Sequence, residues 1–179
     1  MTLGVALTPA NLLDNLTVQS GTFRNGGFAI TLAANKNFIV QNGAMFILTG
    51  TSTMAGVSGT GTKTFGATSA ADYSGVNQAV TRETYGHLLM SGSGTKTPAA
   101  GTTGVVGNFS LAGGVTFAGP TNNPVYQFQG NFSNSGTFNS GTGVHTLQWQ
   151  RRTNVYRCND VCQSNHRQHR QRTFAQQQY

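Results

Sequence analysis

Two cysteines and two histidines near the C-terminal end of the chain have a spacing that could hold a metal ion. Cys158, Cys162, His166 and His169 stand at positions i, i+4, i+8 and i+11, which share one face of a helix. Thiolates and imidazoles are common ligands of a tetrahedral zinc ion. The spacing differs from that of the usual zinc fingers, and no β-hairpin precedes it. These residues are therefore candidate zinc ligands. A Cys158–Cys162 disulfide is one alternative, and an unstructured tail without metal is the interpretation we favour.

A glycine-rich string around Lys63 resembles a phosphate-binding loop. Residues 59–64 read Gly-Thr-Gly-Thr-Lys-Thr, but such a loop needs glycine directly before the lysine and a helix directly after the string. The quartet at 61–64 also recurs as Gly-Thr-Lys-Thr at 94–97. The string is therefore interpreted as part of a repeat, and we expect neither a nucleotide nor any other cofactor.

Acidic residues are too few and too dispersed for hydrolytic chemistry. Before residue 148 the chain contains only Asp14, Asp72 and Glu83, whereas glycan-cleaving enzymes need clustered carboxylates. In coils of roughly 20 residues, Asp72 and Glu83 would point from different walls. His87 and His145 are isolated, and we expect both to be exposed strand residues. The sequence predicts no catalytic residues and no enzymatic activity.

Aromatic residues follow a repeated spacing through the body of the chain. Asn-Phe-x4-Gly-x-x-Phe describes both 37–46 and 108–117, and a shortened copy covers 131–138. Fixed spacings of roughly 20–50 residues are typical of solenoids, propellers and arrays. We expect the phenylalanines of the three copies to stack in the core: Phe38, Phe46, Phe109, Phe117, Phe132 and Phe138.

The composition limits the elements that can position these residues to short strands and turns. Only 8% of the 179 residues are charged and 24 are glycine. Thr, Ser, Asn, Val and Phe are abundant, which favours strands and tight turns over helices. Apolar or alternating runs such as 28–32 and 44–48 lie between turns that contain glycine. A helical bundle and an α/β enzyme are excluded on these grounds.

The fold that we predict is all-β, with a right-handed parallel β-helix of about seven coils over residues 1–147. In such a solenoid each apolar side chain packs on its equivalent in the next coil. A β-sandwich of about seven strands explains the alternation equally well, but not the repeated aromatic spacing. Thr-x-Thr occurs at 51–53, 62–64 and 95–97, which is too uneven to predict an ice-binding ladder.

The tail, residues 148–179, has a different composition. It holds six arginines against one acidic residue, Asp160. Binding to nucleic acid through phosphate neutralisation is one interpretation, but we expect a disordered basic tail without a specific nucleic-acid partner. Codons can be chosen for residues 148–170 that, when read one nucleotide out of frame, encode a sequence with the residue types of the repeat. We therefore infer a frameshift in this tail.

Residues 85–97 (Tyr-Gly-His-Leu-Leu-Met-Ser-Gly-Ser-Gly-Thr-Lys-Thr) and 107–117 (Gly-Asn-Phe-Ser-Leu-Ala-Gly-Gly-Val-Thr-Phe) resemble the repeats of large bacterial surface proteins. These Gly/Thr/Asn-rich, adhesin-like parallel β-helix proteins are similar to filamentous-haemagglutinin and autotransporter passenger stalks. The resemblance covers roughly residues 12–147. It implies secretion, a structural or adhesive role, and a parent chain longer than this one.

The expected location is extracellular or at the cell surface, although the N-terminal residues do not resemble a signal peptide. The partners that follow are glycans or the surface of a host or neighbouring cell. Unpaired coils at the two ends of a solenoid also predict self-association. No membrane span is expected, because no apolar run approaches ~18 residues. The alternative function is a carbohydrate-binding β-sandwich module.

Overall fold

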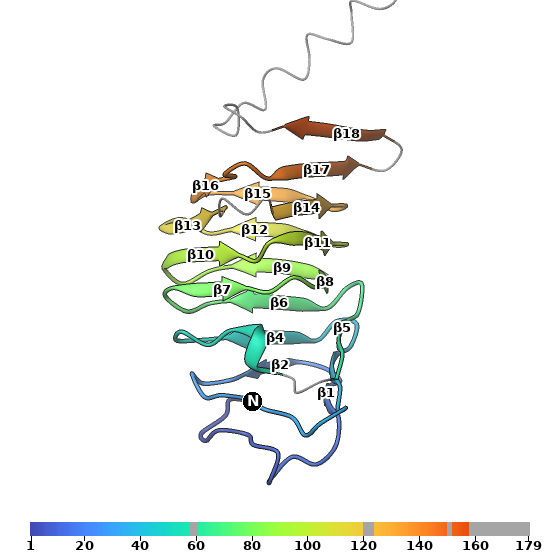
Figure 1. Ribbon diagram of the computed structural model, residues 1–179, viewed down its shortest axis with the longest axis vertical. Coiled ribbons are helices and arrows are strands. Elements are labelled where there is room, and N and C mark those ends of the chain that lie inside the picture. Colours follow the sequence, from blue (N-terminus) through green and yellow to red (C-terminus); the bar gives the residue numbers. More distant parts are fainter. Residues whose placement is uncertain (58–60, 120–123, 150–151, 158–179) are drawn as a thin grey trace, which may run out of the picture.

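The protein is a stack of parallel strands wound into a β-solenoid of about six turns, as the computed structural model shows (Figure 1). It describes residues 1–57, 61–119, 124–149 and 152–157. Within these ranges the only helix is the short 3-10 helix η1 (Met54–Val57). All pairings among β1 to β17 are parallel. The predicted solenoid is confirmed, and the β-sandwich alternative is wrong.

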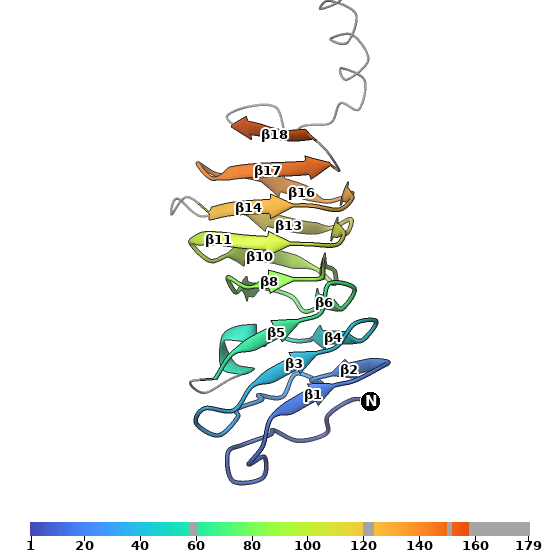
Figure 2. The same cartoon turned by 90° about the vertical axis from the view of Figure 1, so that its right-hand side faces the viewer.

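The strands form three walls, seen from two sides in Figures 1 and 2. Wall 1 contains β2 (Thr22–Arg24), β4 (Met45–Leu48), β6 (Ala70–Tyr73), β9 (His87–Met90), β12 (Phe109–Leu111) and β15 (Phe132–Asn134). Wall 2 contains β7 (Gln78–Val80), β10 (Gly94–Pro98), β13 (Val115–Ala118) and β16 (Thr137–Asn139). Wall 3 consists of two sheets that meet where β5 contacts β8. The first contains β1 (Leu16–Val18), β3 (Phe38–Val40) and β5 (Lys63–Phe65). The second contains β8 (Thr84–Tyr85), β11 (Gly101–Val105), β14 (Pro124–Phe128), β17 (Val144–Trp149) and β18 (Arg152–Arg157).

Stacked apolar side chains fill the space between the walls, because equivalent positions of successive coils lie in register. In wall 1, Leu88 pairs with Phe109, which pairs with Phe132. The rings of Phe109 and Phe132 are stacked with centroids 5.0 Å apart, and those of Phe117 and Phe138 with centroids 4.4 Å apart. Phe38, Phe46, Phe109 and Phe117 are fully buried, whereas Phe132 and Phe138, in the last coil, are half-buried. The predicted aromatic core is confirmed.

The repeated aromatic motif, however, is used on different walls. Phe38 lies in wall 3 and Phe46 in wall 1, while Phe109 lies in wall 1 and Phe117 in wall 2. The sequence suggested that the two copies occupy equivalent positions of the coil, but in the structure they do not. The motif describes a corner, in which two short inward-facing strands flank a turn, and such a corner can join any two walls.

Asparagine side chains tie each coil to the next at the corners. The amide of Asn37 donates to Asn15 Oδ1 at 2.8 Å, and the amide of Thr62 donates to Asn37 Oδ1 at 3.0 Å. Further along the rod, the amide of Asn131 donates to Asn108 Oδ1 at 3.1 Å. Each asparagine thus satisfies a backbone group at the point where the chain turns and cannot continue the strand ladder.

The solenoid changes its pairing at the C-terminal end. β18 pairs antiparallel with β17, from Val144 opposite Arg157 to Trp149 opposite Arg152. The expected boundary at residue 148 lies inside β17, and residues 152–157 form the further strand β18. Residues 158–179, the greater part of the predicted tail, lie outside the described residues, and the frameshift stays a hypothesis.

Wall 2 has no strand in the first coils. Where later coils carry β7, β10, β13 and β16, the early coils carry residues 25–35 and residues 49–57 with η1, which do not pair with each other as strands. The regular wall begins at β7 (Figure 1). This irregular start leaves an opening in the side of the rod.

Candidate functional site

The candidate zinc ligands Cys158, Cys162, His166 and His169 lie outside the described residues, so the metal prediction is untested. Elsewhere, over the ranges that the structure covers, no three His, Cys, Asp or Glu side chains come together to hold a metal ion. Nor does any helix of the described part have the length and apolar character needed to cross a membrane.

The three acidic side chains of the described part of the chain lie apart, each with its own partner. Asp72 lies on wall 1 and accepts hydrogen bonds from Ser91 Oγ at 2.8 and 2.9 Å. Partial burial raises the pKa of this carboxyl above its ordinary value. Glu83, beside wall 3, pairs with Lys63 Nζ at 3.4 Å, and Asp14 pairs with Lys36 Nζ at 3.3 Å. They form no acid–base pair, and Asp72 and Glu83 lie on different walls, as the sequence suggested.

His145 is buried, which corrects the expectation of an exposed strand residue. It lies in β17 facing the core, among the rings of Phe117, Tyr126, Phe128 and Phe138, with centroids 5.3–6.4 Å from its own. Burial lowers the pKa of the imidazole below its ordinary value. The strand alternation places it inward, in register with Tyr126 and Thr103. His87 is half-buried at a corner, where its Nδ1 accepts the Asn108 amide at 2.8 Å.

Lys96, from the second Gly-Thr-Lys-Thr string, points into the core. Its Nζ donates to Gly75 O at 2.7 Å, to Val76 O at 3.2 Å and to Gln78 Oε1 at 2.8 Å. The three acceptors match the three hydrogens of an ammonium group. Burial lowers the pKa of Lys96 to about 8. The lysine therefore fastens the corner before β7 and leaves no donor for a phosphate.

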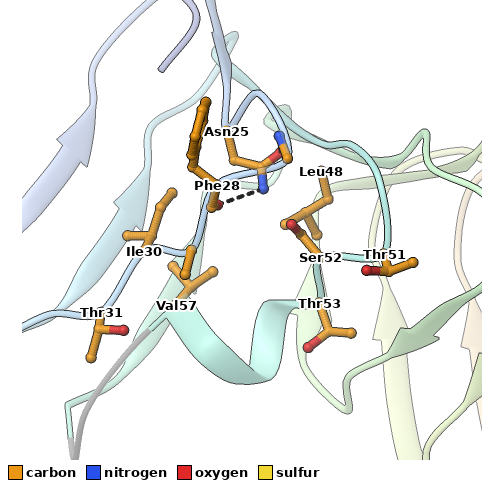
Figure 3. Close-up of a pocket in the computed structure, with 11 residues that line it drawn as sticks. Asn25, Phe28, Ile30, Thr31, Leu48, Thr51, Ser52, Thr53 and Val57 are labelled. Carbon is orange, nitrogen blue, oxygen red and sulfur yellow. Dashed lines mark hydrogen bonds between the residues drawn. The ribbon is translucent and has the colours of Figure 1, made fainter. Parts of the chain in front are cut away.

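A pocket opens where wall 2 lacks its early strands (Figure 3). It lies between residues 25–31 on one side and residues 48–57 on the other, with a volume of about 200 Å³. Ile30, Leu48 and Val57 are its buried apolar residues, and Phe28 is 38% exposed. Hydroxyl-bearing residues line both sides, with Thr31 on the side of residues 25–31 and Thr51, Ser52 and Thr53 on the side of residues 48–57 (Figure 3). None of the described residues that line it is charged.

One side of this pocket ends in an open backbone edge. The amide of Leu7 donates to Ala29 O at 3.0 Å, and the amide of Thr31 donates to Leu7 O at 2.8 Å. In a parallel bridge of this kind, the N–H and C=O of the middle residue, Ile30, point to the opposite edge. Ile30 lines the pocket together with residues 51–53 and Val57, and among the described residues its N–H and C=O have no hydrogen-bond partner.

Buried side chains fix both sides of the pocket. Asn25 is 1% exposed. Its Oδ1 accepts the Thr49 amide at 2.8 Å, and its Nδ2 donates to Phe28 O at 2.9 Å. On the other side, Gln78 Nε2 donates to Ser52 O at 2.8 Å, while Gln78 Oε1 accepts from Lys96. The chain segments that line the pocket are thus held by hydrogen bonds from the core, which makes its shape largely preformed.

Sequence reasoning missed this pocket because it assigned residues 28–32 to a strand and expected regular walls, whereas only Ile30 of this run forms a bridge. The assignment of 44–48 to a strand is confirmed, since β4 covers Met45–Leu48. The available signal was Thr51-Ser-Thr53, a polar run where an inward-facing apolar residue is expected, and the Gly-Gly pair at 26–27.

A second feature that the sequence did not predict is a threonine column. Thr95, Thr116 and Thr137 pair in register on the outer face of wall 2; only the first belongs to a Thr-x-Thr string.

Comparison of the chain with models of known protein families gives no match, and neither do comparisons with curated proteins and with solved structures.

Proposed function

We propose that the chain is a non-catalytic, extending and adhesive segment of a secreted or cell-surface bacterial repeat protein. The observation that supports this is the in-register core, in which equivalent side chains of successive coils contact each other along one axis. Each coil adds length without changing the cross-section. At ~4.8 Å per coil, the solenoid spans on the order of 30 Å.

The outward-facing positions support an adhesive role. The paired columns on the outer faces contain Thr95, Thr116 and Thr137 on wall 2, and Ser110 and Ser133 on wall 1. Such hydroxyls can both donate and accept hydrogen bonds. A surface of this kind suits contact with neutral polar partners, such as the glycans of another cell, better than contact with a polyanion.

Retention of cells under flow tests the adhesive part of the proposal. The full chain is displayed on a non-adherent bacterium, and cells are counted after flow over a glycan-coated surface and over a bare one. Many weak contacts acting together should raise retention on glycans by about tenfold or more. Cells that carry the anchor alone are the control. Equal retention of the two cell types, with the displayed chain folded, would contradict adhesion.

The extending part is tested by duplicating one coil. Leu88 and Phe109 occupy equivalent positions in wall 1, so a second copy of residues 88–108 keeps every side chain on its wall. We expect the longer chain to fold and to melt at least as high as the original, because an interior coil adds one more buried interface. Insertion of half that segment, which breaks the register, should prevent folding of the coils that follow.

A further inference from the structure

We propose that the pocket between residues 25–31 and 48–57 binds a single neutral sugar ring. The proposal deepens the adhesive function, since it names the class of ligand and the place of contact, and it rests on that function for its biological meaning. The pocket itself is argued from its size, its lack of charge, its two kinds of lining and its rigidity.

The size of the pocket limits the ligand to one ring. Its volume of about 200 Å³ lies below the roughly 300–1,000 Å³ of clefts that hold drug-sized molecules. One pyranose fits this space, whereas a disaccharide must leave its second ring outside, as the end of a glycan chain would.

The polar lining calls for a ligand that both donates and accepts hydrogen bonds. Thr31, Ser52 and Thr53 supply hydroxyls, and Ile30 supplies an unpaired N–H beside an unpaired C=O. Among the described residues, no lysine, arginine or carboxylate lines the pocket. A charged ligand would therefore lose its hydration without gaining a counter-charge. A neutral polyol meets this lining with hydroxyl groups of its own.

The apolar lining matches the C–H groups on the faces of a sugar ring. Ile30, Leu48 and Val57 are buried side chains that line the pocket from both segments, and Phe28, on the segment of Ile30, is partly exposed (Figure 3). A pyranose carries C–H groups on its faces and hydroxyls around its edge. With the C–H groups on the apolar residues, the hydroxyls reach the threonine and serine side chains. Phe28 is one of the few large apolar side chains that stay exposed in the described part.

An extended peptide fits the open edge less well. Strand addition needs a row of unpaired backbone groups. Here Ala29 and Thr31 already bond to Leu7, so Ile30 offers one residue's pair of groups. The anchoring of both sides by Asn25 and Gln78 also opposes the separation that a whole strand would require. Preformed sides favour a small rigid ring, which binds with little ordering cost.

Titration of the full chain with methyl pyranosides, followed by amide NMR, tests the proposal. Methyl glucoside, galactoside, mannoside and N-acetylglucosaminide are added in turn. We expect at least one to shift the amides of residues 28–31 and 51–53 in a saturable way. Phe28→Ala and Thr53→Val should each weaken binding by about threefold to tenfold. The matched controls Val76→Ala and Thr97→Val change an exposed apolar and an exposed hydroxyl side chain away from the pocket, and should leave affinity unchanged.

Two results would overturn the sugar site. In one, none of the glycosides shifts the pocket amides of the folded chain. In the other, a glycoside binds but the shifts lie elsewhere and the two pocket variants bind as well as the original. Both leave adhesion to be decided by the flow assay. Conversely, saturable binding in the pocket without retention of displaying cells would confirm the site and refute adhesion.

Discussion

Lys63 and Lys96 occupy the same place in two copies of Gly-Thr-Lys-Thr, yet their surroundings differ. Lys96 is fully buried with three acceptors around its ammonium group, whereas Lys63 has a partly exposed pair with Glu83. A repeated string therefore does not imply a repeated role. The difference arises because the strings lie on different walls, β5 in wall 3 and β10 in wall 2.

Replacing Lys96 by methionine should lower the free energy of unfolding by about 2–4 kcal/mol, because the carbonyls of Gly75 and Val76 lose their buried donor and Gln78 Oε1 keeps only the Gly75 amide. Lys63→Met is the matched control and should cost about 1 kcal/mol or less, since its ion pair is partly hydrated. Denaturant unfolding measures both. Equal losses in the two variants would show that the Lys96 network adds nothing to stability.

The buried imidazole of His145 should make the protein sensitive to acid. Burial lowers its pKa in the folded chain below the ordinary value of 6.5, so the unfolded chain takes up a proton first as the pH falls. The contribution of neutral His145 to the free energy of unfolding is therefore complete above about pH 6.5. It is lost as the pH falls toward the pKa of His145 in the folded chain. Melting curves between pH 7 and pH 5 measure the loss.

His145→Phe should remove that part of the pH dependence, because phenylalanine fits the same aromatic surroundings and does not titrate. His87→Gln serves as the control for the other described histidine and should retain the acid loss. If the His145→Phe variant loses stability with acid as steeply as the original, the dependence comes from other groups.

The aromatic stack should carry a large share of stability. Phe109 is 1% exposed and contacts the rings of Phe117, Phe128, Phe132 and Phe138. Phe109→Ala should cost about 3–5 kcal/mol, as for other buried aromatics. Ser110→Ala, one residue further on the outer face, should cost less than about 0.5 kcal/mol. A similar loss in both variants, measured by chemical denaturation, would contradict the stacked core.

At the scale of elements, the corners decide where strands begin and end. A Cβ at Gly75 would overlap the Gly50 carbonyl oxygen of the preceding coil, whereas one at Gly113 would lie 3.7 Å from its nearest neighbour, Ser135 O. Gly75→Ala should therefore force the coils apart and lower the melting temperature clearly. Gly113→Ala should be tolerated. An unchanged melting temperature for Gly75→Ala would mean that the corner can relax.

Much of this architecture could be predicted from the sequence. The alternation of 38–40 or 125–128 identifies strands, and the spacing of the phenylalanines identifies stacking. What could not be predicted is the wall to which each strand belongs. Phe38 and Phe109 look equivalent because a corner has the same local chemistry wherever it occurs, and long-range register alone distinguishes the walls.

The candidate site illustrates the same limit. The pocket exists because residues 25–35 and 49–57 fail to pair, and a missing pairing leaves little trace in local composition. Likewise, His145 is polar and was assigned to the surface. It is buried because Val144 and Thr146, on either side of it in β17, face outward.

At the scale of the molecule, the last coil leaves pairing groups open. β15 and β16 each have a strand neighbour on one side within the described ranges, and Phe132 and Phe138 are only half-buried there. We expect the chain to self-associate through this end, because an open strand edge beside apolar surface favours pairing with another chain. Sedimentation at increasing concentration measures the association.

Replacing Phe132 and Phe138 together by lysine should shift the chain toward the monomer, because charges oppose edge-to-edge contact. Val76→Lys, which changes an exposed apolar residue on the side of the rod, is the control and should leave association unchanged. Association that survives the double substitution would place the contact elsewhere on the molecule.

The parallel pairing of coils has a mechanical consequence. Between neighbouring coils the backbone hydrogen bonds run along the rod, so a pull on its two ends loads them along their length and opens one coil at a time. In an extension trace this gives a series of small, nearly equal steps in place of a single rupture. A coil such as that from Leu88 to Phe109 releases about 70 Å of chain at ~3.3–3.6 Å per residue. Such a segment would therefore lengthen under load by many times its folded height.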